Sequence, residues 1–285
     1  MKETRAEYLP IEKLKPFESH PFKVTDNEEM EQLTESIHQQ GVLNPIMVRP
    51  LDTGEYEVIS GHRRLHACKK AGIEMIPAFV CSMDRSEAVV AMVDSNLHRE
   101  KLLPSEKAFA YKMKMDALKH QGQRTDLTLA QVAPKLATEQ IAESAKTSKD
   151  TVKRYIRLTN LIPDILEMVD ESKIALTPAV ELSYLTVEEQ YDLLDTMKSE
   201  DCTPSLSQAL KMREFSKAGK LSMDVIFSIM TQPKANQKEK ISFHVNDLRG
   251  YFPQGYTAAQ MIQEIFRLLE DHRVRTIRRR DRDER

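Results

Sequence analysis

The sequence has no tryptophan, only three cysteines and only eight glycines among its 285 residues. The scarcity of glycine and tryptophan disfavours a large all-β fold. Cys68, Cys81 and Cys202 have neither the spacing of metal ligands nor the even number that a disulfide framework needs, so we interpret them as buried thiols in a reducing cytosol. No apolar run reaches the length of a membrane span, and the charged start MKETRAE does not resemble a signal peptide. We therefore expect a cytoplasmic protein that does not enter a membrane.

The chain also lacks a strong net charge. Its 42 lysines and arginines nearly balance 44 aspartates and glutamates, which gives a formal charge of −2. Any affinity for nucleic acid must therefore come from local basic patches rather than from the charge of the whole molecule. A chain of this length can hold two or three domains, each with its own core.

Strand and helix patterns divide the chain into successive parts. Residues 1–103 alternate between the two patterns, which predicts an α/β domain and an α+β class for the whole chain. Residues 104–230 predict an all-α domain. The helices expected in it lie at 105–121, 127–136, 138–145, 149–161, 163–171, 178–184, 187–198 and 205–217.

The C-terminal part is short and ends in arginines. Residues 231–240 predict a polar linker, and residues 241–272 predict a strand (ISFHV, 241–245) followed by an amphipathic helix. A module this small cannot bury a core alone, so we expect it to pair with a second copy of the chain. Residues 273–285 predict a disordered, Arg-rich tail that either contacts phosphates or remains solvated and partly neutralised by its own acidic residues.

The segment EYEVISGHRRLHACKKAGI (residues 55–73) predicts a strand, a turn at Gly61 and a helix. A helix start carries partial positive charge and free N–H groups, so arginine is mildly unfavourable there. Arg63 and Arg64 nevertheless occupy that end without a local acceptor, and such a donor array suits a phosphate or polyphosphate. The alternative is that both arginines point to solvent or pair with distant carboxylates.

A second segment, TEQIAESAKTSKDTVKRYIRL (138–158), predicts a helix-turn-helix. Ser148 would cap the second helix, and Val152 and Tyr155 would face inward. The outward residues would meet base edges and phosphates. They are Lys149, Asp150, Thr151, Lys153 and Arg154. Lys146 occupies a turn position that usually holds glycine, so an ordinary helical hairpin remains the alternative.

Together these motifs resemble the ParB-type chromosome and plasmid partition proteins. GVLNPIMVRP is similar to the family's first N-terminal box, YEVISGHRRLHACKKAG to its Gly-Glu-Arg-Arg box, and SNLHREKLLPSEKAFAY to its third box. The helix-turn-helix follows at the expected distance, and the likeness extends from Tyr8 to about Leu185. The family's N-terminal domain has a fold similar to that of sulfiredoxins.

The resemblance implies a CTP- and Mg²⁺-binding DNA clamp. Such proteins form homodimers, read a palindromic site in double-stranded DNA, associate with the nucleoid or a plasmid, and work with a ParA-type ATPase. Carried over to this sequence, the nucleotide-binding residues are Leu43, Asn44, Ile46, Gly61, His62, Arg63, Arg64, Ser95, Asn96 and Arg99. The DNA-binding residues are Ser148, Lys149, Asp150, Thr151, Lys153 and Arg154. Asn96 is also the expected metal ligand.

Two positions depart from the family pattern: the first is a conservative change within the donor array, and the second concerns catalysis. His62 stands where the family usually has glutamate, and Ser95 replaces the glutamate that precedes asparagine in the third box. Mg²⁺ prefers charged oxygen ligands, and the neighbouring Asp94 would be turned by about 100° on a helix. We therefore expect nucleotide binding, but at most a weak CTPase activity.

Two other functions remain open at this stage. The protein could be a transcription regulator of a plasmid or mobile element, since only about seven residues precede the domain and a long ATPase-activating peptide would not fit there. It could also be an enzyme of the sulfiredoxin-like superfamily. Sulfiredoxins, however, have a cysteine directly before the His-Arg pair, and this sequence has Gly61 at that position.

Overall fold

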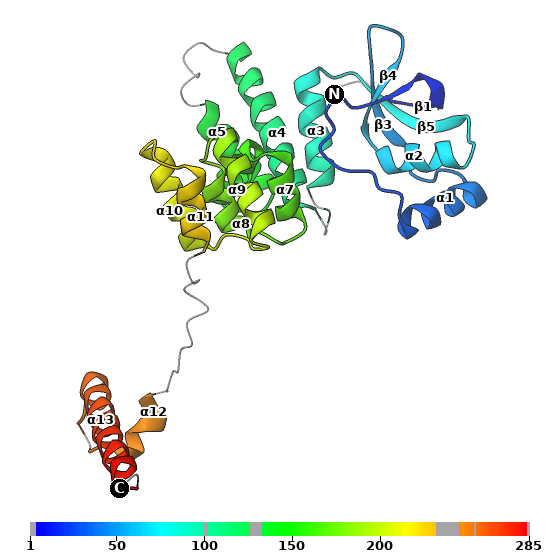
Figure 1. The fold of residues 1–285 in the computed structure, drawn as a ribbon. Coiled ribbons are helices and arrows are strands. Elements are labelled where there is room, and N and C mark those ends of the chain that lie inside the picture. The colour runs from blue at the N-terminus through cyan, green and yellow to red at the C-terminus, as the bar shows by residue number, and fades with distance from the viewer. Residues whose placement is uncertain are drawn as a thin grey trace. The chain divides into compact units, whose positions relative to one another are not determined.

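The computed structural model describes residues 4–97, 99, 102–125, 133–231, 245–253 and 255–283. Within it the chain forms two compact units, Met1–Gln232 and Pro233–Arg285. The first contains a mixed β-sheet followed by a series of helices, and the second contains a short helix and a long one (Figure 1). The α+β class predicted from the sequence is confirmed.

The N-terminal part is built around a five-stranded sheet with the order β1-β5-β3-β4-β2. Strands β1/β5 and β3/β4 pair antiparallel, whereas β3/β5 and β2/β4 pair parallel. In chain order the elements are β1 (Thr4–Pro10), a 3₁₀ turn η1 (Ile11–Lys13), β2 (Leu14–Pro16), α1 (Glu28–Gln40), β3 (Ile46–Pro50), β4 (Tyr56–Ser60), α2 (His62–Lys70), β5 (Met75–Cys81) and α3 (Arg85–Asn96).

Helices cover both faces of this sheet. Because successive residues of a strand point to opposite faces, Val58 joins a core with α1 and α2, whereas Ile59 joins a second core with α3. The amphipathic stripe predicted for α1 is buried through Met30 and Ile37. Gly41 ends that helix with a φ of 72°, a value that suits glycine.

The second core also includes α4 (Pro104–Thr125), the first helix after the sheet domain. Ala110 and Ala117 of α4 are buried in the same cluster as Phe17, Phe22 and residues of α3. The sheet domain and the helical region therefore share apolar packing and form one unit, although the sequence pattern changes between residues 103 and 104.

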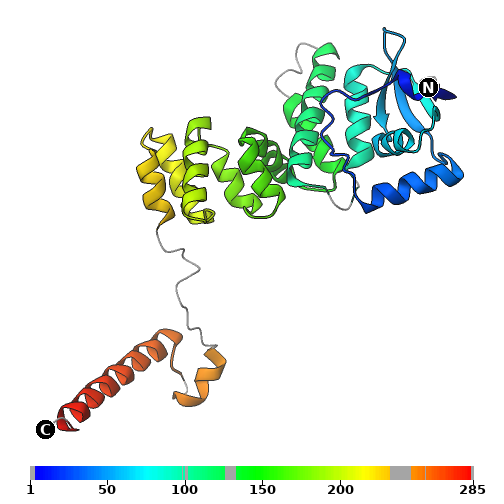
Figure 2. The ribbon, with the colours of Figure 1, turned by 45° about the vertical axis from the view of Figure 1, so that its right-hand side comes forward.

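The helical region continues through seven further α-helices in the described ranges. They are α5 (Ala133–Ser144), α6 (Lys149–Arg157), α7 (Pro163–Asp170), α8 (Leu176–Leu182), α9 (Val187–Ser199), α10 (Leu206–Lys217) and α11 (Met223–Met230), with a 3₁₀ turn η2 (Leu158–Asn160) after α6. Figure 2 shows the later helices, in green to yellow, packed in succession. One apolar cluster, which includes Leu158, Ile165, Leu193 and Met212, joins α6–α11.

Two details differ from the sequence prediction for this region. Separate helices expected at 127–136 and 138–145 are a single helix, α5, from Ala133 onward, because Pro134 lies in its first turn, where proline is tolerated, and no glycine or proline follows it up to Ser144. Residues 126–132 lie outside the described residues. Helix α11 was not among the individually predicted helices, although its segment lies within the part predicted to be helical.

The C-terminal unit contains α12 (Val245–Leu248), a 3₁₀ turn η4 (Arg249–Tyr251) and α13 (Ala258–Asp283). The strand predicted at 241–245 falls mostly outside the described residues, and Val245 itself begins a helix. The prediction of a disordered tail from residue 273 was wrong, because α13 continues to Asp283. The segment has no glycine or proline and is rich in arginine, which is a good helix former.

None of the helices in the described ranges is both long and apolar enough to cross a membrane.

Candidate functional site

Gly61 makes the turn between β4 and α2 that the sequence predicted. Its φ of 103° is strongly disfavoured for other residues, and a Cβ there would lie 2.6 Å from the Cγ2 of Ile46. The first intrahelical bond of α2 runs from the Leu65 N–H to the Gly61 carbonyl (2.9 Å). The preceding amides of His62, Arg63 and Arg64 therefore lie at the open, positive end of the helix.

His62 is buried at this helix start, and its ring lies against a second imidazole at an interplanar angle of 39°. The ring centroids of His62 and His20 lie 3.8 Å apart, and the Phe17 N–H donates to His62 Nε2 (3.4 Å). Burial, with smaller contributions from His20 and Arg99, lowers the pKa of His62 to about 3. His20 Nδ1 contacts the Phe22 carbonyl oxygen at 2.8 Å, and burial also lowers the pKa of His20. Both rings are therefore neutral at pH 7.

This depressed pKa predicts a pH-dependent stability. Between the ordinary pKa of 6.5 and the folded value of about 3, the unfolded chain protonates His62 whereas the folded chain does not. The free energy of unfolding should therefore decrease as the pH falls below 6.5, by up to about 1.4 kcal/mol per pH unit. Urea unfolding at pH 7.5, 6.5 and 5.5 should show a steeper loss for the parent than for His62→Gln. The control is His66→Gln, which changes a more exposed histidine of the same helix and should show the same pH dependence as the parent. If the free energy of unfolding falls equally with pH in the parent and in His62→Gln, the pH dependence does not come from His62.

The two arginines of α2 have different surroundings. Arg63 pairs with Glu29 of α1 (Nη2 to Oε2, 3.2 Å), and both side chains are substantially exposed. Arg64 Nη1 donates to the carbonyl oxygens of Asn44 and Pro45, at 2.7 Å for Pro45. The acceptors thus come from residues distant in the sequence, and for Arg63 the alternative of a pair with a distant carboxylate is the one observed in the unliganded chain. The Glu29 pair is an exposed one that a ligand can replace at little cost, whereas Arg64 holds the segment before β3 against α2.

Arg99 lies close to the start of α2. Partial burial and the nearby charge of Arg63 lower the pKa of Arg99, while Glu106 acts in the opposite direction. Its guanidinium also lies over the ring of Phe22, 5.7 Å from the centroid. Two like charges thus approach each other from α2 and from the segment after α3. Such an arrangement favours binding of an anion between them.

The last turn of α3 brings Ser95 and Asn96 to the same region as Arg99. The Arg99 N–H donates to the Asn96 carbonyl oxygen (3.1 Å). The Asn96 side chain is buried, and its Nδ2 donates to the Met92 carbonyl oxygen (2.7 Å). With Nδ2 engaged in this way, Oδ1 is the atom that can accept a donor or bind a cation. Ser95 Oγ donates to the same carbonyl oxygen (2.9 Å).

Asp94 points away from these groups, as the sequence predicted from the helix turn. Its carboxylate pairs with the ammonium of Lys114 on α4. No group of three or more histidine, cysteine, aspartate or glutamate side chains suited to a metal occurs in the part of the chain that the structure describes.

Leu43, Asn44 and Ile46, the predicted nucleotide-binding residues of the first box, differ in exposure. The Leu43 side chain is 75% exposed and Asn44 is also exposed, so both are accessible to a ligand. Ile46 is fully buried and packs beneath Gly61. The side chain of Ile46 therefore supports the glycine turn from the core, and any contact of this residue with a ligand would be made by its backbone.

The predicted helix-turn-helix consists of α5 and α6. The Thr151 N–H donates to Ser148 Oγ (3.1 Å), so Ser148 caps α6 as expected. Val152 is buried with Ile141, and Tyr155 packs against the same cluster. Lys146 has a φ of 49°, which is the unusual conformation that the missing turn glycine implied.

The cations on the outer face of α6 each have an intramolecular partner. Lys149 pairs with Glu139 of α5, and Lys153 Nζ lies 4.0 Å from Asp150. Arg154 Nη2 donates to Thr177 Oγ1 at the start of α8 (2.6 Å). The Lys153 side chain is 67% exposed and is thus the most weakly held of the three.

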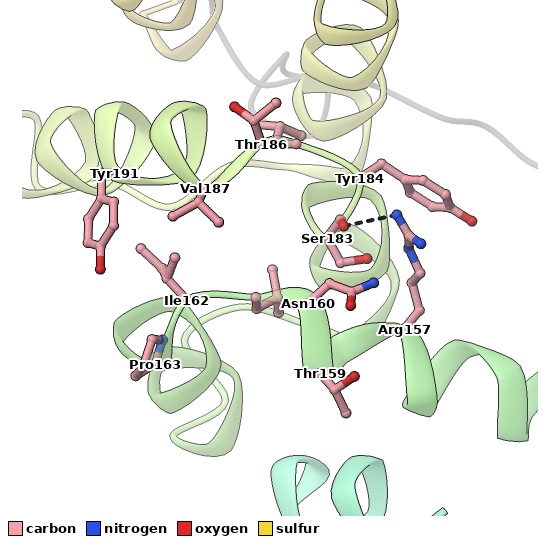
Figure 3. A pocket seen from close by; sticks show the side chains of 12 residues that line it. Arg157, Thr159, Asn160, Ile162, Pro163, Ser183, Tyr184, Thr186, Val187 and Tyr191 are labelled. Carbon is pink, nitrogen blue, oxygen red and sulfur yellow. Dashed lines mark hydrogen bonds between the residues drawn. The ribbon is translucent and has the colours of Figure 1, made fainter. Parts of the chain in front are cut away.

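The C-terminal end of α6 borders a pocket of about 600 Å³ (Figure 3). Arg157 Nη2 donates to the Ser183 carbonyl oxygen (3.1 Å), and the guanidinium carbons of Arg157 and Arg213 each lie 3.8 Å from the Tyr184 ring centroid. These contacts fix the end of α6 to α8 and α10. None of the nucleotide-binding or DNA-binding residues predicted from the sequence lines this pocket. Its lining consists of Arg157, Thr159, Asn160, Leu161, Ile162, Pro163, Ser183, Tyr184, Leu185, Thr186, Val187 and Tyr191.

Several participating residues could not be found from the sequence. His20 and Glu29 lie more than thirty residues before the groups that they contact, and Lys114 reads as one of several lysines of an ordinary helix. A motif search does not detect such partners, because only the folded chain brings them together.

Comparison with known proteins agrees with both motifs. The profile described as ParB N-terminal domain matches residues 1–97, and the profile described as ParB HTH domain matches residues 100–210. A probable chromosome-partitioning protein ParB from Vibrio cholerae is 29% identical over 244 residues, which are 85% of this chain and 77% of that protein. A nucleoid occlusion protein from Listeria monocytogenes is 31% identical over 186 residues, 65% of this chain and 60% of that protein.

Two solved structures of C-terminally truncated ParB from Caulobacter crescentus are also similar. The one complexed to the centromeric parS site has a TM-score of 0.43 and 22% identity, and covers 79% of this chain and 98% of its own. The one complexed with CTP-gamma-S has a TM-score of 0.32 and 27% identity, with 63% and 92% covered. The chromosome-partitioning protein Spo0J from Thermus thermophilus is 30% identical over 205 residues, 72% of this chain and 70% of that protein. This chain belongs to the ParB-type family of partition proteins.

Proposed function

We propose that this protein is a CTP-dependent, site-specific DNA-binding clamp for chromosome or plasmid partition, acting in the cytoplasm on the nucleoid or a plasmid. The observation that carries the proposal is the approach of Arg63 and Arg99 at the open start of α2, whose first turn has no acidic residue, in a chain that also contains a helix-turn-helix. The family membership supports the same reading.

The triphosphate would bind at the start of α2. The free amides after Gly61 and the positive helix end favour an anion, and Arg63 can exchange its exposed pair with Glu29 for a phosphate. Arg99 would approach the same phosphates from the segment after α3. His62 contributes a neutral, buried ring at this position, so it supports the turn rather than adding charge.

The residues present also suit Mg²⁺ held mainly by the nucleotide. This ion usually keeps several waters and binds through one or two protein groups together with phosphate oxygens. Asn96 Oδ1 would supply the protein ligand, with Ser95 beside it. A bound Mg²⁺ would neutralise phosphate charge. Since Asp94 is paired with Lys114, no carboxylate of α3 replaces the family glutamate, and we expect slow CTP hydrolysis at most.

The exposed Leu43 and Asn44 would contact the base next to the carbonyl groups that Arg64 holds in place. Isothermal calorimetry with CTP, UTP, ATP and GTP, each with Mg²⁺, tests this assignment directly. We expect a measurable heat of binding for CTP and at least a tenfold weaker response for the other three. Equal binding of all four, or of none, would contradict the nucleotide assignment.

A palindromic DNA site requires two reading heads, and the C-terminal unit provides a surface for pairing. On α13 the side chains of Ile262, Phe266 and Leu269 are 53%, 67% and 60% exposed and recur at helical spacing. An apolar stripe of this kind on a small unit indicates a partner surface. We propose that two copies of α13 bury these stripes against each other in a homodimer.

Phe266→Asp should therefore convert the dimer to a monomer at micromolar concentration, because it places a charge in the paired stripe. Sedimentation equilibrium of the full chain measures the change, and we expect a dissociation constant at least tenfold higher. The matched control Asp271→Asn changes the opposite side of α13 and should leave the dimer intact. A dimer unaffected by Phe266→Asp would place the pairing surface elsewhere.

The cellular role would follow from the partners of the clamp. A ParA-type ATPase would make it a segregation protein, whereas the relatives named nucleoid occlusion proteins show that the family also includes other roles. Deletion of the gene should increase the fraction of cells without the replicon if the role is partition. A change confined to transcription near its binding sites would favour a regulator.

A further inference from the structure

Lys114 of α4 is a buried charged residue that neither predicted site includes. Its side chain is only 4% exposed. The ammonium pairs with the carboxylate of Asp94 on α3 and donates to Ser144 Oγ on α5 (2.7 Å). A buried ammonium is costly unless its donors are satisfied, so the three groups depend on one another.

One end of this trio lies at the predicted nucleotide site. Asp94 directly precedes Ser95 and Asn96, which share the Met92 carbonyl oxygen within the last turn of α3. Because these residues belong to one helical turn, a shift of Asn96 towards a bound ligand also moves Asp94. Lys114 would then have to follow Asp94 or lose its ionic partner.

The other end lies at the helix-turn-helix. Ser144 is the last residue of α5, and its Oγ also donates to the Ile141 carbonyl oxygen (3.2 Å). The turn with the left-handed Lys146 follows at once and leads to Ser148, the cap of α6. Ser144 therefore lies directly before the turn that leads to the predicted reading helix.

Apolar packing also holds α4 in place, in addition to this polar trio. Ala110 and Ala117 of α4 pack with the sheet domain, while Tyr111 and Met115 of the same helix pack with α5 and α6. Apolar contacts thus hold α4 on both sides. Buried ion pairs can often be replaced by apolar groups without loss of stability, so another role is needed to explain a lysine at this position.

We propose that Lys114 is a positioning residue that couples occupancy of the nucleotide site to the DNA-reading helix through Asp94 and Ser144. The inference rests on the proposed function, because it assumes a ligand at Asn96. It assigns the coupling to one lysine, which contacts the two sites through different acceptors.

The test is a thermodynamic cycle on the full-length chain. The DNA dissociation constant is measured by fluorescence anisotropy with and without saturating CTP and Mg²⁺, and the ratio of the two constants is the coupling factor. The parent should show a factor of about 5 to 150 in one direction, the usual range for coupled sites. Lys114→Met and Ser144→Ala should bring it within about twofold of one. Neither substitution should change the affinity for CTP alone by more than about threefold.

Lys112→Met is the matched control, since Lys112 is exposed on the same helix, and it should retain the parent's coupling factor. If Lys114→Met does not fold, Ser144→Ala carries the same expectation. A folded variant that keeps the parent's coupling factor overturns the role of Lys114 while leaving the proposed function intact. If the parent protein does not bind CTP, both the role of Lys114 and the proposed function are wrong. The titration of the parent shows this before any variant is made.

Discussion

Arg63→Ala is expected to weaken CTP binding by about 2–4 kcal/mol, roughly 30- to 1,000-fold, with little change in protein stability. Removing one partner from a desolvated charge pair typically costs this much. In the unliganded chain Arg63 makes only an exposed pair with Glu29, which contributes little to folding. Calorimetry with CTP and Mg²⁺ measures the first effect, and urea unfolding measures the second.

Arg64→Ala is the matched comparison, because it removes the same charge from the neighbouring position. Arg64 donates to two backbone carbonyl groups and is partly buried, with burial lowering its pKa. Its loss should decrease the free energy of unfolding by about 1–3 kcal/mol, since two backbone carbonyl groups, one of them partly buried, lose hydrogen bonds from a charged donor. Reversed results, with a stability loss for Arg63→Ala and a specific binding loss for Arg64→Ala, would exchange the two roles.

A third variant, Glu29→Gln, tests whether Glu29 competes with the nucleotide for Arg63 or orients Arg63 for binding. If Glu29 only occupies Arg63 until the nucleotide arrives, its neutralisation should strengthen CTP binding by a few-fold, because the ligand no longer competes with a carboxylate. A weaker affinity would instead show that Glu29 orients Arg63 for binding.

The sequence predicted much of this site because its signals are local. A glycine turn, a helix start with two arginines and a serine cap are determined by neighbours in the chain, and the structure contains each of them. Local reasoning also predicted the strained Lys146. What it could not assign was the partner of each cation. The Glu29 and Asn44 contacts of the two arginines depend on how α1 and the segment before β3 pack against α2.

The same distinction explains the errors outside the site. Charge composition predicted a disordered tail, but α13 continues through the arginines. Arginine has a high helix propensity, and the segment contains no glycine or proline that would end the helix. Ile46 matched a family box and was predicted to line the nucleobase pocket, where backbone groups would recognise the base, and the strand alternation places its side chain in the core under Gly61. A motif gives the position of a residue, whereas the direction of its side chain follows from the packing.

Arg154→Ala should weaken specific DNA binding by about 1–3 kcal/mol, and the loss should depend on the base pair that Arg154 meets. Arg154 is suited to this role because its guanidinium is already held at the start of α8 by Thr177, which reduces the entropy lost on binding. Anisotropy titrations with the cognate site and with single-base variants measure the change. The variant should bind cognate and substituted sites with similar affinity.

Lys153→Ala provides the contrast within the same helix turn. The Lys153 side chain is 67% exposed and only loosely paired with Asp150, as expected for a cation that meets phosphate. Its removal should weaken binding to all sequences alike and reduce the slope of log K against log salt by about 0.9. Thr177→Val tests the support of Arg154 separately, since it removes the hydroxyl but keeps the charge, and should cause a smaller loss than Arg154→Ala. The opposite result would be that Arg154→Ala lowers all affinities uniformly while Lys153→Ala lowers them selectively. Lys153 would then be the residue that reads the base, and Thr177 would hold Arg154 in place for a phosphate contact.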